Sequence, residues 1–155
     1  MALVTLTQLK AGLESGECLL GLDLGSKTVG VAVADPAGII ASPLETIQRT
    51  KFRDDAKRLV TLIAERRAGG IVLGLPVSMD GTEGPRCQST RQFAENLEIE
   101  AGIGLPIALW DERLSTSAVE KFLINEADMT RKRRGQVVDK MAAAYILQGA
   151  LDAPG

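Results

Sequence analysis

The chain has 155 residues, of which 45% are hydrophobic and 25% charged, a composition typical of one globular domain with a substantial core. Its formal net charge of -2 excludes a uniformly basic nucleic-acid binder but is compatible with a local basic patch. The sequence contains no histidine, which excludes serine–histidine and cysteine–histidine catalysis, imidazole zinc sites and paired-histidine ribonuclease chemistry. Any acid–base or metal chemistry must therefore use Asp, Glu and Lys.

The remaining composition narrows the class of protein further. No segment predicts a membrane span or a secretion signal, and the two separated cysteines predict neither a disulfide framework nor a metal cluster, so we expect a cytoplasmic protein. Because aromatic residues make up only 3%, we do not expect base stacking on aromatic platforms to dominate any nucleic-acid binding. Without an internal repeat or linker, the sequence predicts a single domain over 1–155, with a short N-terminal helical extension at about 1–17.

The first half of the chain predicts a short helix, three strands and a longer helix. The short helix covers residues 5–14. Strands at about 18–24, 28–34 and 38–47 are joined by short turns, which predicts an antiparallel meander. Hydrophobic residues then recur at helical spacing from Phe52 until Gly69-Gly70 ends that helix.

The second half alternates strands with helices. Strands are predicted at 71–75 and 107–110, a polar and basic stretch at 127–136, and helices at 85–100, 117–125 and 137–151. The whole order predicts an α/β fold, in which a mixed sheet continues from the antiparallel meander into parallel strands with helices on both faces. Functional sites in such sheets gather at the carboxyl ends of the parallel strands.

Asp23 is a charged residue in an otherwise apolar first strand. Leu22 and Leu24 share one face of this strand, and Gly21 shares the other with Asp23, because side chains alternate along a strand. An unpaired buried charge costs several kcal/mol, and the small neighbours on its face leave room for a ligand. Asp23 is therefore a candidate ligand for a cation or phosphate, or else a turn-forming residue that caps the backbone at 25–26.

Further acidic residues end a strand or begin a helix. Asp111 and Glu112 follow the 107–110 strand, and Asp139 lies in the first turn of the last helix, on a small, apolar face that should pack near Asp23. Asp139 could instead serve only the helix dipole, and the other two could be solvated with Arg113 as their partner.

Carboxylates from separate elements, in a chain without histidine, suit hard cations such as Mg²⁺ or Mn²⁺. Two such ions can activate a water for phosphodiester cleavage. Without metal, we expect the cluster to destabilise the fold and its carboxyl pKa values to be raised.

Four sequence blocks carry a family resemblance. They are DLGSKTVGVA from Asp23, GLP and MDGTEGPR within 74–86, DERLST from Asp111, and DKMAA with ILQ from Asp139. With these blocks in this order, the chain resembles the YqgF/RuvX family, which has an RNase H-like fold, from about residue 20 to 152. Only the N-terminal helix lies outside the resemblance.

The resemblance implies a metal-dependent nuclease that matures the 5′ end of pre-16S ribosomal RNA, or else a Holliday junction resolvase. It implies Asp23 as the central ligand of Mg²⁺ or Mn²⁺, Glu112 with Asp111 close behind as the second acid, and Asp139 as the third. The sequence departs from the related RuvC resolvases, whose second acid ends the strand after the first crossover helix. Here that strand ends without an acid at 73–76, so the choice between Asp111 and Glu112 stays open.

Basic residues near these acids are candidates for nucleic-acid binding. The run Arg131-Lys132-Arg133-Arg134 could be a solvated loop, but beside an acidic site it could hold a phosphate backbone. The further candidates are Lys27, Arg86 and Arg113, of which Arg113 could equally be a structural partner of the nearby acids.

Two other classes of function are compatible with parts of the sequence. An actin-like ATPase or sugar kinase also has phosphate loops that open with Asp-x-Gly, but it needs two such domains. A non-catalytic RNA-binding factor would keep the fold without cleavage. For a nuclease, the expected partner is structured RNA or branched DNA, and a homodimer would suit a four-way junction by symmetry.

Overall fold

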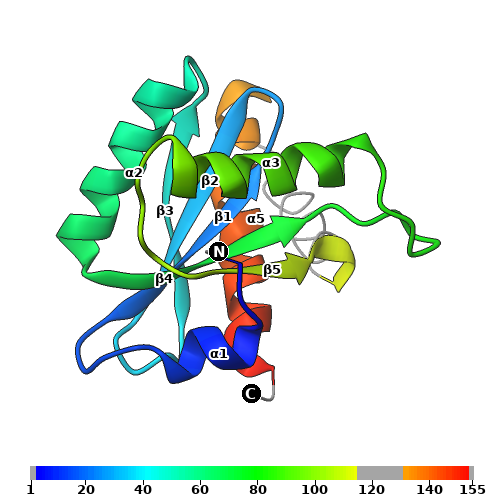
Figure 1. The fold of residues 1–155 in the computed structure, drawn as a ribbon. Helices are drawn as coiled ribbons and strands as arrows, with labels where there is room; N and C mark the ends of the chain where they lie inside the picture. Colours follow the sequence, from blue (N-terminus) through cyan, green and yellow to red (C-terminus); the bar gives the residue numbers. More distant parts are fainter. Residues whose placement is uncertain (1–2, 115–130, 154–155) are drawn as a thin grey trace.

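The computed structural model describes residues 3–114 and 131–153, apart from the side chains of residue 114 and of 131–137. In this part of the chain one five-stranded sheet has the strand order β3-β2-β1-β4-β5 (Figure 1). Its strands are β1 Cys18–Leu24, β2 Thr28–Ala34, β3 Ala41–Gln48, β4 Ala68–Leu75 and β5 Ile107–Asp111. The helices are α1 Leu6–Ala11, α2 Phe52–Arg66, α3 Pro85–Ile99, the 3₁₀ turn η1 Glu112–Leu114, and α5 Arg131–Asp152.

The sheet is mixed, as the sequence predicts. β1 pairs with β2, and β2 with β3, in antiparallel fashion, whereas β4 lies parallel to both β1 and β5. Asp23 lies opposite Gly30 across the β1–β2 pair. Because β1, β4 and β5 are parallel, their carboxyl ends reach the same edge of the sheet (Figure 1).

The two faces of the sheet are covered by different helices. Helices α2 and α3 lie over one face, and their Leu59, Phe93 and Leu97 join the alternate residues of β1, β2 and β4 in one core cluster (Figure 1). Helix α5 and the short α1 cover the other face. The alternation predicted for β1 is confirmed, because Leu22 belongs to the first cluster while Gly21 faces α5.

Glycines in β1 and β2 let α5 approach the sheet very closely. A Cβ at Gly21 would lie 2.7 Å from Leu147 Cβ, and one at Gly30 would overlap the backbone of Asp139. Ala143 on the same helix face is fully buried. The expectation that this face packs near Asp23 is confirmed, and the close approach brings Asp139 over the β1–β2 pair.

The prediction that Gly69-Gly70 ends the second helix was wrong. The helix ends at Arg66, its C-cap Arg67 has a left-handed backbone with φ 54°, and both glycines lie inside β4. They serve close packing, because a Cβ at Gly69 would lie 2.5 Å from Glu17 Oε1 and one at Gly70 would overlap Leu9.

Other boundaries also differ from the sequence prediction. Strand β3 begins at Ala41, three residues later than expected, after the turn in which Asp35 accepts hydrogen bonds from the backbone of Ile39 and Ile40. Helix α5 begins at Arg131, so the basic run expected before the helix is part of it. The helix expected at 117–125 lies outside the described residues.

Helix α1 joins the second face of the sheet to the end of α5. Its Thr5 and Gln8 form a reciprocal capping box, and its Leu9 is completely buried. Lys10 Nζ donates hydrogen bonds to the carbonyl oxygens of Leu151 at 3.3 Å and Ala153 at 2.8 Å.

Within the described ranges, no helix is both long and apolar enough to cross a membrane.

Candidate active site

Asp23 and Glu112 form a half-buried pair of carboxyl groups at the edge where β1 and β5 end. Their side chains share a hydrogen bond. Burial, together with the hydrogen bond and negative charge of Asp23, raises the pKa of Glu112 to about 8. Burial is also the main cause of the raised pKa of Asp23, and the Asp139 carboxylate adds to it. At neutral pH Glu112 therefore keeps its proton and donates it to the Asp23 carboxylate.

Asp139 is held beside this pair by a residue of β2. Thr28 Oγ1 donates a hydrogen bond of 2.6 Å to Asp139 Oδ2. The hydroxyl lies on the α5 face of β2 because Thr28 alternates with Val29, whose side chain is in the opposite core. The Asp139 charge is close enough to Asp23 to disfavour ionisation of Asp23.

Gly74 in β4 makes room for Glu112 to reach Asp23. A Cβ at Gly74 would lie 2.5 Å from Glu112 Oε1 and 2.9 Å from Glu112 Cγ. Gly74 pairs with Trp110 in the register of β4 and β5, directly before the chain turns into η1. The space that a side chain would fill is therefore occupied by the Glu112 carboxyl group.

Asp111 takes a different direction from its neighbour. Its carboxylate accepts hydrogen bonds from the Arg113 guanidinium at 2.6 and 2.8 Å and from the Arg113 backbone N–H at 2.9 Å. The hydrogen bond from the Arg113 side chain is the main cause that lowers the pKa of Asp111. Of the two adjacent acids, only Glu112 joins Asp23.

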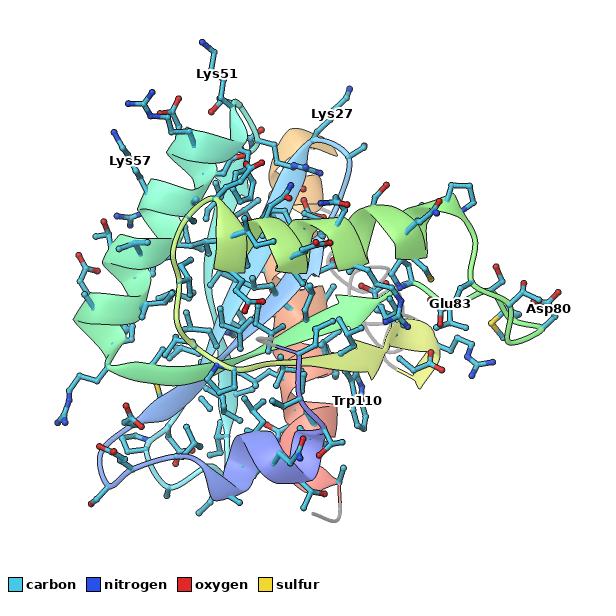
Figure 2. The ribbon with its side chains drawn as sticks, in the orientation of Figure 1. Lys27, Lys51, Lys57, Asp80, Glu83 and Trp110 are labelled. Carbon is cyan, nitrogen blue, oxygen red and sulfur yellow. The ribbon has the colours of Figure 1, made fainter. Side chains whose placement is uncertain are left out.

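The predicted cations are distributed around the acids in different ways. Arg86, exposed in the first turn of α3, is near enough to lower the pKa of both Asp23 and Glu112. Lys27 is exposed in the turn between β1 and β2 and points away from the molecule (Figure 2). Arg113 is engaged with Asp111. The side chains of Arg131, Lys132, Arg133 and Arg134 lie outside the described residues.

The loop between β4 and α3 carries two more acids that point elsewhere. Figure 2 shows Asp80 and Glu83 on this projecting loop. Asp80 accepts hydrogen bonds from Thr82, and Glu83 forms an ion pair of 2.9 Å with Arg91. Their carboxylates therefore have partners within the loop and the first half of α3.

The oxygen ligands offered by these acids fit a hard divalent cation, although the described side chains are not yet arranged as a coordination site. Asp23, Glu112 and Asp139 offer carboxylate oxygens. The raised pKa of Glu112 shows that its surroundings do not stabilise its ionised form, which a bound cation would do. Among the residues that the structure describes, no three acidic or cysteine side chains are grouped closely enough to hold a metal ion as they stand.

Sequence reasoning missed Thr28 and Gly74 as parts of this arrangement. The sequence did carry a signal for Thr28. This residue lies two positions before Gly30 and so shares a face of β2 with it, and Gly30 pairs with Asp23 across the hairpin. Gly74 carried no such signal, since its role depends on the path of η1 after the neighbouring strand.

Comparison with known proteins places the chain among relatives over nearly its whole length. The family model RuvX, described as Holliday junction resolvase, matches residues 17–153. A protein of Phenylobacterium zucineum named "Putative pre-16S rRNA nuclease" is 62% identical over 152 residues, which are 98% of this chain and 97% of the relative.

Two solved structures share the fold. The yeast mitochondrial Holliday junction resolvase Ydc2 matches with a TM-score of 0.53 and 16% identity, over 92% of this chain and 81% of that chain. RuvC of T. thermophilus in complex with a Holliday junction substrate matches with a TM-score of 0.51 and 15% identity, over 87% of this chain and 93% of that chain. With the observed strand order, these matches confirm the predicted RNase H-like fold class.

Proposed function

The chain is a member of the RuvX family, and on that premise we propose that it is a metal-dependent nuclease that matures the 5′ end of pre-16S ribosomal RNA. Hydrolysis of phosphodiester bonds is supported by the family and by the relatives' names. The observation that carries the proposal is the Asp23–Glu112 pair, whose two carboxyl groups retain a proton at neutral pH. Burial of two adjacent carboxyl groups is costly unless a proton or a cation compensates their charge, and a divalent cation would supply that compensation in place of the proton.

We assign the cation to Mg²⁺ or Mn²⁺, held by Asp23, Glu112 and Asp139. These ions prefer oxygen ligands, and when bound they would activate a water and stabilise the leaving oxygen of a phosphodiester. Asp111 is proposed only as a support for η1, because its carboxylate is engaged by Arg113.

The other residues of the site have roles that follow from their positions. Glu112 must lose its proton before it can act as a ligand, and Thr28 holds the Asp139 carboxylate in place through its hydroxyl. Arg86 faces the acids from α3 and is proposed to contact the phosphate that carries the reacting bond. Lys27 and the run 131–134 are proposed to bind flanking phosphates.

The central experiment compares cleavage of a precursor ribosomal RNA that carries its 5′ leader with cleavage of a synthetic four-way DNA junction. The purified chain is assayed with Mg²⁺ or Mn²⁺ and with EDTA. We expect metal-dependent cleavage of the RNA, abolished in Asp23→Asn while its circular dichroism spectrum stays native. Metal-dependent cleavage that persists in Asp23→Asn would refute the assignment of the site.

A matched pair of variants decides between the two adjacent acids. Glu112→Gln should reduce cleavage by about a hundredfold or more, because the proposed metal site loses one anionic carboxylate ligand. Asp111→Asn should keep cleavage within about threefold of the native rate, because it disturbs only an exposed pair with Arg113. The reverse order would assign the second acid to Asp111.

Resolution of Holliday junctions is the second candidate, because the family model itself carries that description. Cleavage of the four-way junction in preference to the RNA would favour it. Such a result should coincide with a dimer in light scattering, since two symmetric cuts require two sites. Binding of the RNA without cleavage of either substrate would instead indicate an RNA-binding factor.

A further inference from the structure

A groove of about 660 Å³ lies on the face of the molecule opposite α5, between α2 and the residues after α3. Its apolar lining includes Phe52, Ala56 and Val60, and Val60 is 45% exposed. Phe52 is one of the few aromatic residues of the chain, and its ring packs edge-on against Phe93 with 5.6 Å between ring centroids. The groove therefore has an apolar floor with one aromatic ring held in a fixed orientation.

Cations line the α2 side of this groove. Arg53 and Lys57, one helical turn apart on α2, contribute to its lining, and Lys51 precedes the helix as its N-cap. Within the described part of the chain, none of these cations forms an ion pair with a carboxylate. Arg58, on the neighbouring face of α2, is by contrast neutralised by Glu45 at 2.6 Å.

The opposite side of the groove carries the acid Glu100, after the end of α3. A polyanion in the groove would be repelled from that side and attracted to α2. This asymmetry fixes where a phosphate backbone would lie, with its phosphates along Arg53 and Lys57 and its bases toward the apolar floor.

The cations continue from the groove toward the candidate active site. Arg49 Nη1 donates a hydrogen bond of 2.6 Å to the Gly25 carbonyl, two residues after Asp23, and its backbone N–H bonds the Lys27 carbonyl at 2.8 Å. Figure 2 shows Lys27, Lys51 and Lys57 pointing outward along the same edge of the molecule. A positively charged path therefore leads from the end of β1 to α2.

We propose that this groove binds a single-stranded segment of the nucleic-acid substrate, beyond the part held at the acidic site. The proposal rests on the proposed nuclease function. Single-stranded nucleic acids take grooves that combine cations for the backbone with apolar or aromatic surface for the bases. A duplex would present only its phosphates and leave the apolar floor uncovered.

The test measures binding in EDTA, so that cleavage does not proceed. Fluorescein-labelled oligouridylate of about 12 nucleotides and an RNA duplex of the same length are titrated with the full chain between about 50 and 200 mM KCl. The variant Arg53→Gln/Lys57→Gln is compared with Arg66→Gln/Arg67→Gln, which removes the same charge from the other end of the same helix.

We expect the groove variant to bind the single strand roughly tenfold more weakly, with a salt dependence of log K smaller by about 1.4 for two lost phosphate contacts. The control variant should stay within about twofold of the native chain, and binding of the duplex should change by less than about threefold. Equal losses in both variants, or equal losses on both probes, would overturn the proposal, because they would indicate general attraction of charge.

The outcome is separable from that of the proposed function. If the native chain cleaves neither substrate but the groove variant alone loses single-strand binding, the groove stands and the nuclease function fails. If the native chain cleaves RNA and the groove variant binds the single strand as tightly as the native chain, the nuclease function stands and the groove proposal fails.

Discussion

Thr28 is the residue whose single hydroxyl fixes a proposed ligand in place. Its hydrogen bond of 2.6 Å to Asp139 Oδ2 involves a charged acceptor, which makes it worth about 1.5–3 kcal/mol. Thr28→Val should therefore lower kcat/KM by roughly ten- to a hundredfold and raise the Mg²⁺ concentration needed for half-maximal cleavage. Thr28→Ser keeps the hydroxyl and should restore both values. Equal activity of the valine and serine variants would show that the hydroxyl does not position Asp139.

Glu112 gives the metal-free protein a defined dependence of stability on pH. Its pKa is raised from 4.5 to about 8 in the folded chain, so the folded state holds a proton that the unfolded state releases. This stabilisation is complete below pH 4.5 and is lost as the pH rises to about 8. In EDTA, Tm should fall across this range, and the raised pKa of Asp23 acts in the same direction.

Glu112→Gln is the control for this dependence, because the amide can still donate to Asp23 and does not ionise. Scanning calorimetry should show a smaller decrease in Tm for the variant between pH 5 and 8, and a higher Tm than the native chain above pH 8. Added Mg²⁺ should raise Tm of the native chain most at alkaline pH. A native Tm in EDTA that rises with pH over this range would contradict the assigned proton.

At the scale of elements, the approach of α5 to the sheet depends on glycines that leave no space for a side chain. A Cβ at Gly30 would overlap the Asp139 carbonyl, so Gly30→Ala must push the part of α5 around Asp139 away from β2. We expect the free energy of unfolding to fall by about 3 kcal/mol and cleavage to be lost.

The control for this prediction is Gly104→Ala, since a Cβ there meets nothing within 4 Å. Urea unfolding followed by circular dichroism should place this variant within about 0.5 kcal/mol of the native chain. Equal stability of the two variants would mean that α5 does not pack as closely as the structure shows.

Some features of these elements are determined by neighbouring residues in the sequence, and others depend on distant segments. Alternation along β1 predicted that Asp23 shares a face with Gly21, the face that α5 covers, because the direction of a strand side chain depends only on its neighbours in sequence. The role of Gly69 could not be predicted in this way, because the glycine accommodates Glu17 from a distant segment. Which of Asp111 and Glu112 reaches Asp23 likewise depends on the turn η1 and on the room beside Gly74.

At the scale of the whole molecule, the first helix lies outside the family match but inside the core. The match begins at residue 17, whereas Leu9 of α1 is 0% exposed and packs with β4 and α5. Lys10 ties the same helix to the last turn of α5 through the Leu151 and Ala153 carbonyls. The helix that the family model leaves out therefore fastens the end of the helix that carries Asp139.

This arrangement predicts that α1 affects stability without affecting chemistry. Leu9→Ala should lower the free energy of unfolding by about 3 kcal/mol and Tm by roughly 10 °C, because it leaves a cavity between α1, β4 and α5. Cleavage per folded molecule should stay native, since Asp139 lies 12 residues, or about 18 Å, along α5 from Leu151. Thr7→Ala, at an exposed position of the same helix, should change neither value. If Leu9→Ala unfolds at the same urea concentration as the native chain, α1 is not docked in solution. If the variant loses cleavage while it is still folded, α1 contributes to the geometry of the site through α5.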